Sequence, residues 1–359
     1  MFGKLYAGEL KKMFSLKTAL IMIAIFIFGF AVITIALNSF KDLTVGAIET
    51  DGPEVDISIW ETFKRNISEE QAKAELNVLK AQLKELEKEK KDKGFTYYMG
   101  FLAGTDGIYN CKSQIAVYKY IIDNGLYNQD LYFYDSAVFA IGGLIDESAT
   151  SFASMMLGVF AFLLSVYALI IGSGAYANEM QNGTLKILLL KPITRNQLTL
   201  AKLLAMLTIV VAAVMAVFVF ITAFSYIAYD DPLDTMYYVF NASSVFKAPV
   251  SFPLFLAWLD LLLGSLAFGI MAFFFGTLMK KRVFGFVFPY AFNFAATIAS
   301  LIGIGRFWIT NTVAWSGFFG MGSGISTGSN FFISMPLAIV YFGGMIALSF
   351  VVFNRRDVA

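Results

Sequence analysis

Residues 178–202 read NEMQNGTLKILLLKPITRNQLTLAK and lie between two long apolar runs. A loop between two membrane spans needs only to be soluble, but this one combines an acid, a Gly-Thr pair, an apolar stretch and a proline. The pattern predicts a short amphipathic helix with Asn182 or Thr184 as its cap, and Pro192 ends it because proline disfavours helix in the preceding residue. The alternative interpretation is an ordinary basic loop on the side of the membrane where such loops gather.

The composition is that of an integral membrane protein. Hydrophobic residues make up 58% of the 359 residues, charged residues make up 15%, and the mean hydropathy is +0.69. The sequence contains no histidine, which excludes His-based zinc sites, Ser-His triads and histidine proton relays. A single cysteine, Cys111, excludes an internal disulfide framework. We predict no metal site, no cofactor in this chain and no nucleic acid partner.

Six stretches are long enough to cross a bilayer, which takes about 20 apolar residues. They are residues 18–37, 151–174, 203–228, 253–278, 283–304 and 332–353. The first is too long for the apolar region of a signal peptide and no A-x-A site follows it, so we interpret it as an uncleaved span. The predicted fold class is therefore an all-α integral membrane protein with six transmembrane helices.

The basic residues predict the orientation of these spans, because Lys and Arg gather in cytoplasmic loops. With the N-terminus inside, the cytoplasmic segments hold thirteen of them: Lys4, Lys11, Lys12, Lys17, Lys186, Lys191, Arg195, Lys202, Lys280, Lys281, Arg282, Arg355 and Arg356. The two short outer loops hold only Lys247 and Arg306. We therefore predict that both termini are cytoplasmic. Lysine outnumbers arginine 21 to 6, which favours a low-GC bacterium and its plasma membrane.

Residues 1–17 predict an amphipathic helix that lies in the cytoplasmic membrane interface. Its apolar residues recur close to helical spacing, with lysines on the other side: Phe2, Leu5, Tyr6, Leu10, Met13 and Phe14. The alternative is a plain charged segment before the first span.

Residues 38–150 predict a large extracellular helical domain between spans 1 and 2, with 12 Lys/Arg and 19 Asp/Glu. Leucines at 76, 79, 83 and 86 predict an amphipathic helix from about Ser68 to Lys93. A second helical pattern runs from Tyr109 to about Asn124, and we expect the two to pack as an antiparallel pair. Residues 131–147 are expected to rest on the outer membrane interface. No paired-acid motif indicates an enzyme here.

Few polar residues lie within the predicted spans. Asp260 in the fourth span is a candidate for contact with cargo, since an ionisable group in a membrane is costly. Asn293 in the fifth span is expected to hydrogen-bond across helices, and Gly264, Ser265 and Gly269 would allow close helix approach. We expect residues 305–331 to form short re-entrant helices before the last span.

The E-x-x-x-G-T-L core of Glu179, Gly183, Thr184 and Leu185, with KPITR at 191–195 and then Lys202, resembles the permease subunits of type-2 ABC exporters. The amphipathic helix before the first span is similar too. The resemblance implies a half-transporter that pairs with a second permease copy or a related permease. It also implies separate cytoplasmic ABC ATPase subunits that carry ATP and Mg, because this sequence has no G-x-x-x-x-G-K-[ST] loop. The chain itself would not be an enzyme.

The resemblance further implies that the helix at about 178–192 is a coupling helix that docks on the ATPase. The residues expected to couple are Glu179, Gly183, Thr184, Leu185, Leu188 and Lys191, with Glu179 pairing with a basic residue of that subunit. Ile187 and Leu189 would add apolar contacts.

The Phe-rich spans carry almost no charge, which favours a hydrophobic or amphipathic substrate, such as a lipid-linked compound or an antimicrobial peptide. Two other functions stay open: an ATP-independent secondary transporter or channel, and a membrane scaffold or sensor that uses its extracellular domain. A neighbouring ATPase gene would distinguish the exporter from both.

Overall fold

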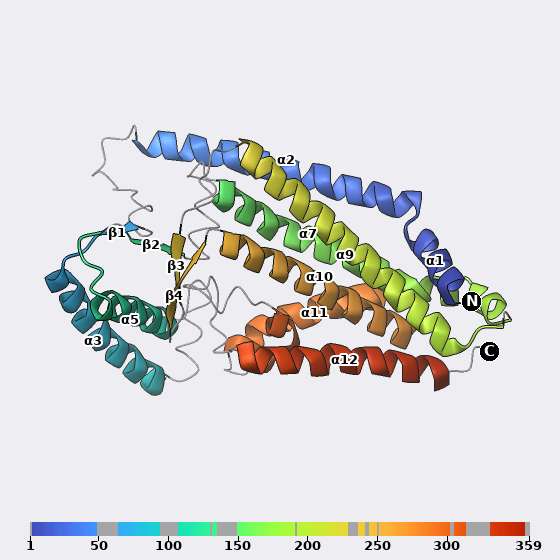
Figure 1. Cartoon of the computed structure of the whole chain (residues 1–359). Coiled ribbons are helices and arrows are strands. Elements are labelled where there is room, and N and C mark those ends of the chain that lie inside the picture. Colours follow the sequence, from blue (N-terminus) through green and yellow to red (C-terminus); the bar gives the residue numbers. More distant parts are fainter. Residues whose placement is uncertain are drawn as a thin grey trace.

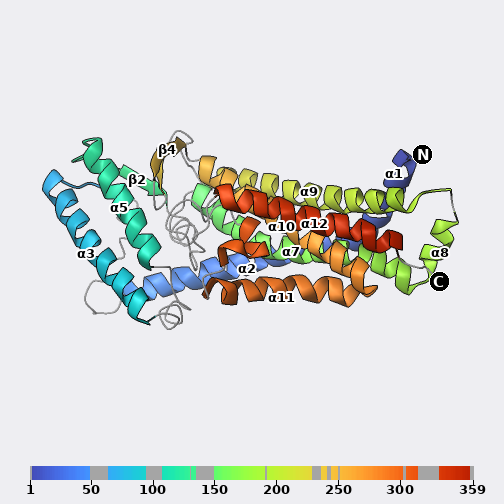
Figure 2. The same ribbon diagram turned by 90° about the horizontal axis from the view of Figure 1, so that it is seen from below.

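The computed structural model describes residues 2–48, 64–93, 107–129, 131–134, 149–190, 192–228, 236–240, 244–249, 251–301, 305–313 and 331–355. The described residues are mostly helical, and long helices run side by side as an elongated bundle (Figure 1, Figure 2). These long helices are α2 (Leu16–Ile48), α7 (Ala149–Gln181), α9 (Arg195–Ala228), α10 (Ser251–Met279), α11 (Arg282–Leu301) and α12 (Phe331–Arg355). Each overlaps one of the six predicted apolar stretches.

Four described helices are long and apolar enough to cross a membrane: α7, α9, α10 and α12. A fifth candidate is the pair formed by α1 (Phe2–Met13) and the start of α2, which are bent by 52° relative to each other. The chain is therefore a multi-pass membrane protein. The bend also separates a short amphipathic helix from the first long apolar one, as the sequence predicts.

Helix α9 begins eight residues before the predicted span at 203–228, because its start is capped. The Thr194 hydroxyl accepts a hydrogen bond from the Gln197 backbone N–H at 3.2 Å. The Gln197 side chain in turn accepts one from the Thr194 N–H at 3.2 Å. This reciprocal capping box satisfies two backbone donors that the first turn leaves unpaired. The polar residues before 203 therefore belong to the helix.

Helices α7, α10 and α11 pack through small residues, which let helix backbones approach closely in a membrane. A Cβ added at Gly172 of α7 would lie 2.5 Å from the Gly269 carbonyl oxygen of α10. A Cβ at Gly285 of α11 would lie 2.8 Å from both the Ala272 carbonyl oxygen and the Ser173 Cβ. The predicted close approach at Gly269 is confirmed, whereas a Cβ added at Gly264 would meet nothing within 4 Å among the described residues.

A smaller unit lies at the end of the molecule opposite to α1 (Figure 1). Its helices α3 (Glu69–Lys93) and α5 (Gly107–Asp123) agree with the two predicted helices. The Ser68 hydroxyl and the Gln71 side chain form a second capping box at the start of α3. The four leucines of α3 are half-buried while most of their neighbours are exposed, which fits the predicted apolar face.

The same unit contains a four-stranded sheet that the all-helical prediction missed. Its strands, in spatial order, are β1 (Lys64–Arg65), β2 (Leu131–Tyr134), β3 (Met236–Phe240) and β4 (Val245–Pro249). Strand β2 pairs with β3 in parallel, and the other two pairings are antiparallel. Of residues 131–147, which were expected to rest on the outer membrane interface, residues 131–134 form β2 and residues 135–147 lie outside the described residues. Leu131 is 3% exposed and packs with Val117, Ile121 and Phe240.

Residues 305–313 form two short 3-10 helices, η3 (Gly305–Phe307) and η4 (Ile309–Val313). The Trp308 indole N–H donates a hydrogen bond to the Phe292 carbonyl of α11 at 2.7 Å. The Tyr341 hydroxyl of α12 donates one to the Phe307 carbonyl at 2.7 Å. The segment therefore packs as short helices on α11 and α12, and residues 314–330 of the predicted re-entrant stretch lie outside the described residues.

Candidate functional site

A short helix, α8 (Thr184–Leu189), forms within the stretch predicted to be a coupling helix, at the end of the bundle that holds α1 (Figure 2). Gly183 is its N-cap, with φ 68 and ψ 1, and no side chain caps it. The prediction that Asn182 or Thr184 caps the helix is therefore wrong. Gly183 instead makes a left-handed turn that glycine adopts without steric cost. This turn lets α8 leave the direction of α7.

The residues of α8 divide into an inner and an outer set. Leu185 is 2% exposed and belongs to the main apolar core, and Leu188 is half-buried against it. Thr184 and Lys186 are exposed, and Leu190, just after the helix, is 85% exposed. Leu185 therefore anchors α8 to its own chain rather than contacting a partner. Lys191 and the side chains of Ile187 and Leu189 lie outside the described residues.

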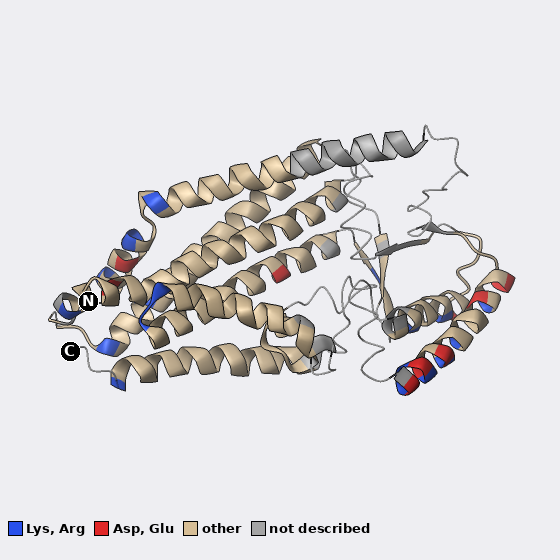
Figure 3. Ribbon diagram, turned by 180° about the vertical axis from the view of Figure 1, so that it is seen from behind, with Lys and Arg blue, Asp and Glu red and all other residues tan. Residues whose placement is uncertain are grey.

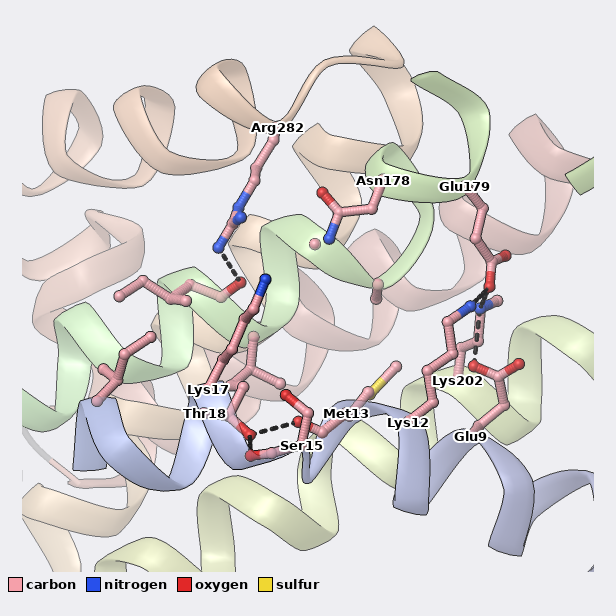
Figure 4. Close-up of a pocket in the computed structure, with 15 residues that line it drawn as sticks. Glu9, Lys12, Met13, Ser15, Lys17, Thr18, Asn178, Glu179, Lys202 and Arg282 are labelled. Atoms are coloured by element: carbon pink, nitrogen blue, oxygen red, sulfur yellow. Dashed lines mark hydrogen bonds and ion pairs between the residues drawn. The ribbon is translucent and has the colours of Figure 1, made fainter. Parts of the chain in front are cut away.

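Glu179 is the largest departure from the prediction, which expected it to pair with a basic residue of the ATPase. It is 4% exposed, and its Oε1 accepts from the Lys202 ammonium at 2.8 Å and from Lys12. The Lys202 Nζ also donates to Glu9 Oε2 at 2.8 Å. We call Glu9, Lys12, Glu179 and Lys202 the ionic cluster; Figure 4 shows their side chains converging.

Three separate helices bring the ionic cluster together. Glu179 lies on the last turn of α7, Lys202 lies two turns into α9, and Glu9 and Lys12 lie one turn apart on α1. Lys202 is fully buried, and Glu9 is 4% exposed. Charges this far from water are tolerated only when they are paired, so the cluster fixes the three helix ends relative to one another.

An aromatic side chain completes the wall around Lys202. The Tyr176 ring centroid lies 5.4 Å from the Lys202 Nζ, within the range of a cation–π contact. The Tyr176 hydroxyl donates to the Thr199 hydroxyl at 2.7 Å. Tyr176 lies one turn before Glu179 on α7, and Thr199 lies one turn before Lys202 on α9. The faces of α7 and α9 that form the ionic cluster therefore also form the Tyr176–Thr199 hydrogen bond.

Helix α12 is also held at this end of the bundle. The Arg195 guanidinium donates to the carbonyls of Phe353 at 3.4 Å and Asn354 at 3.1 Å, in the last turn of α12. The Phe353 ring is fully buried, with its centroid 4.5 Å from that of Tyr176. A cation at a helix C-terminus also interacts favourably with the helix dipole. The start of α9 thus holds α1, α7 and α12.

Sequence analysis missed Glu9, Lys12, Tyr176 and Thr199 as functional candidates. One signal for Glu9 was present, because this acid lies on the apolar face of α1, between Leu5 and Met13 at helical spacing. An acid on an apolar helix face needs a buried cation. Lys202, which interrupts the apolar pattern of α9, is that cation.

The other predicted residues do not join this site. Asp260 is half-buried in α10, 19 residues before its end at Met279, or about 28 Å along the helix axis. Asn293 is exposed on α11, and no described residue hydrogen-bonds to it, so the described part of the chain does not contain the expected bond across helices. Among the described residues, no group of three or more acids or cysteines could hold a metal ion.

Comparison with protein families decides the class. The family model described as ABC-2 family transporter protein matches residues 4–283, which include α1, the ionic cluster and α8. The chain belongs to this family. No curated protein and no solved structure matches it.

Membership in the ABC-2 family makes the chain a permease, the membrane subunit of an ABC transporter, which is not catalytic itself. Permeases of this family work with ABC ATPase subunits. The match includes residues 179–202, which carry the resemblance inferred from the sequence.

Proposed function

We propose that the chain is the permease of an ABC exporter in a bacterial plasma membrane, with α2, α7, α9, α10, α11 and α12 as six spans. Separate ATPase subunits bind ATP and Mg, and the permease pairs with a second copy or a related permease. The observation that carries the proposal is α8: a short helix with exposed residues, joined through Gly183 to a helix end that the ionic cluster holds.

We propose that α8 transmits movement because its base is tied to three helices at once. A displacement of α8 by the ATPase acts on the end of α7 through Gly183 and Leu185. Glu179 passes it to α9 and α1 through Lys202, and Arg195 passes it to α12. Breaking a buried ion pair of this kind costs about 3–5 kcal/mol, so the four helix ends move together.

The orientation that supports this proposal puts α1 and α8 in the cytoplasm and the unit of α3, α5 and the sheet outside. Figure 3 shows basic residues gathered at the α1 end and mixed charges on α3. The test places single cysteines at exposed positions near opposite ends of a Cys111→Ser chain. Ala81→Cys on α3 should react with an impermeant maleimide added outside the cell, whereas Asn182→Cys should react only after the cells are permeabilised. Reaction of both from one side would contradict six spans.

The substrate is proposed to be hydrophobic or amphipathic. The bundle is lined with aromatic rings, such as Phe160 between Phe26 and Phe30, and Asp260 is the one acid between the ends of α10. Vesicles with the permease and its ATPase should transport a labelled lipid-linked compound or amphipathic peptide on addition of ATP. Transport of an inorganic ion without ATP would instead indicate the secondary transporter or channel.

The coupling role of α8 is tested with Leu190→Asp, which alters an exposed residue and leaves the permease core intact. A candidate ABC ATPase subunit is co-purified with each variant, and complex formation and substrate-stimulated ATP hydrolysis are measured. We expect loss of stimulation in Leu190→Asp, because truncation of a central apolar contact typically costs about 1–4 kcal/mol of binding.

The matched control is Val78→Asp, an equally drastic change at a 51% exposed residue of α3 at the other end of the molecule. It should assemble and hydrolyse ATP like the native permease. Normal stimulated hydrolysis in Leu190→Asp would mean that α8 is only a basic loop. Absence of any ATPase that assembles with the chain would favour the scaffold or sensor.

A further inference from the structure

A cavity of about 270 Å³ opens beside the ionic cluster, at the bend between α1 and α2. Five helices line it: the end of α1, the start of α2, the last turns of α7, α9 through Lys202 and the first residue of α11. The proposed coupling mechanism uses only its inner wall, where Glu9, Glu179 and Lys202 pair. The rest of the cavity has no role in that mechanism.

The outer wall carries positive charge without acids to match. Both carboxylates that line the cavity, Glu9 and Glu179, accept from Lys202, and Glu179 also accepts from Lys12. Neither Lys17 nor Arg282 forms an ion pair with any described residue, although the Arg282 guanidinium donates to the Ile170 carbonyl at 3.4 Å. Figure 4 shows the heads of Lys17 and Arg282 pointing toward each other across the cavity.

A third donor faces the same space. Gly174 keeps the wall of α7 open there, because a Cβ at this position would lie 3.0 Å from Asn178 Nδ2 and 4.0 Å from Arg282 Nε. The Lys17 ammonium, the Arg282 guanidinium and the Asn178 amide thus line the same cavity. Two like charges that converge repel each other, and an anion between them relieves that repulsion. A guanidinium matches the oxygens of a phosphate group particularly well.

A further part of the wall is apolar and lies beside an exposed apolar surface. Ile21, Ile170 and Ile171 line the cavity, and the outer surface of α2 just beyond it exposes Leu16, Leu20 and Ile23. A soluble anion would gain nothing from these side chains, whereas the acyl chains of a lipid would cover them. Basic pockets between membrane helices at the cytoplasmic side are known to bind anionic lipid head groups.

We propose that this cavity binds the phosphate head group of an anionic membrane phospholipid, with Lys17, Asn178 and Arg282 as its ligands. The lipid joins the start of α2, the end of α7 and the start of α11, three helix ends that the ionic cluster does not connect to one another. It lies next to the ionic cluster and outside it, so its binding can be removed without breaking the cluster.

The test uses the purified full chain in a mild non-ionic detergent and a Lys17→Gln/Arg282→Gln variant. Bound phosphatidylglycerol is measured by native mass spectrometry, and its effect on Tm by thermal unfolding. Affinity for phosphatidylglycerol should fall roughly 30-fold, since each basic residue at a membrane surface contributes about fivefold. The native chain should bind phosphatidylcholine weakly, and inorganic phosphate should not raise its Tm.

The matched control is Lys11→Gln/Lys281→Gln, which removes the same charge from exposed lysines at the same end that do not line the cavity. It should bind phosphatidylglycerol like the native chain. Arg282→Gln alone, which disturbs the fold less, should lose about fivefold. The proposal is overturned by equal losses in the pocket and control variants, by equal binding of phosphatidylcholine, or by protection with inorganic phosphate, which would indicate a soluble anion.

Discussion

Lys202→Met removes the buried cation that two carboxylates share. In the native chain, Lys202 Nζ lies 2.8 Å from both Glu9 and Glu179, with Lys202 fully buried. Methionine fills a similar volume but leaves Glu179 with only Lys12, whose side chain is 55% exposed, and Glu9 with no ion pair among the described residues. Removal of one partner from a buried ionic group costs about 3–5 kcal/mol.

The measurement is thermal unfolding of the purified permease in detergent, followed by the loss of its monodisperse elution peak. At roughly 2 °C per kcal/mol for a chain of this size, Lys202→Met should lower Tm by about 5–10 °C. Lys186→Met removes an exposed lysine of α8 and should leave Tm within about 1 °C, because exposed charges contribute little.

A third variant separates charge from packing. Glu9→Gln/Glu179→Gln/Lys202→Met removes all three buried charges, and replacement of a whole buried ionic group is often neutral. Its Tm should recover most of the loss, while ATP hydrolysis stays uncoupled from substrate. The reasoning is refuted if Lys202→Met is as stable as Lys186→Met, or if the triple variant is as unstable as Lys202→Met.

Three further predictions concern single positions. Gly172→Val should lower Tm by an amount that corresponds to about 1–3 kcal/mol, because its Cβ meets the Gly269 carbonyl. Gly158→Val on the same helix, where a Cβ meets nothing within 4 Å, is the control, and equal Tm values for the two variants would contradict the packing. Burial raises the pKa of the Cys111 thiol, with Glu87 adding to the rise, so the thiolate fraction at neutral pH falls. The rate of maleimide labelling should therefore be low at pH 7 and reach half its maximum above the usual pH of about 8.5, and fast labelling at pH 7 would contradict this. Gly183→Ala should reduce substrate-stimulated ATP hydrolysis, with Gly183→Asn retaining more, because asparagine tolerates a φ of 68 better than alanine; equal activities would show that the turn is not required.

The sequence predicted elements whose signals are local. The apolar stretches became the long helices, and leucines at 76, 79, 83 and 86 became the half-buried face of α3. Pro192 limited α8 as expected, since the helix ends at Leu189. In each case a propensity, a spacing or a breaker acts within a few residues.

The misses depend on residues that are far apart along the chain. The pairing of β2 with β3 joins residues 133–134 to 238–239, and neither short strand alternates clearly enough to predict it. Glu179 carries no mark of its own that distinguishes an exposed acid from one paired with Lys202 on the next helix. Single-sequence reasoning identified the motif correctly and assigned its acid to the wrong partner.

The parallel pairing of β2 with β3 has a mechanical consequence. The segment that contains β2 leads into α7, whereas β3 and β4 connect α9 to α10, so backbone hydrogen bonds cross-link two connections of the bundle at that end. Any movement that pulls these two connections apart must break main-chain hydrogen bonds between β2 and β3. The sheet therefore limits how far the two connections can separate while their strands stay paired.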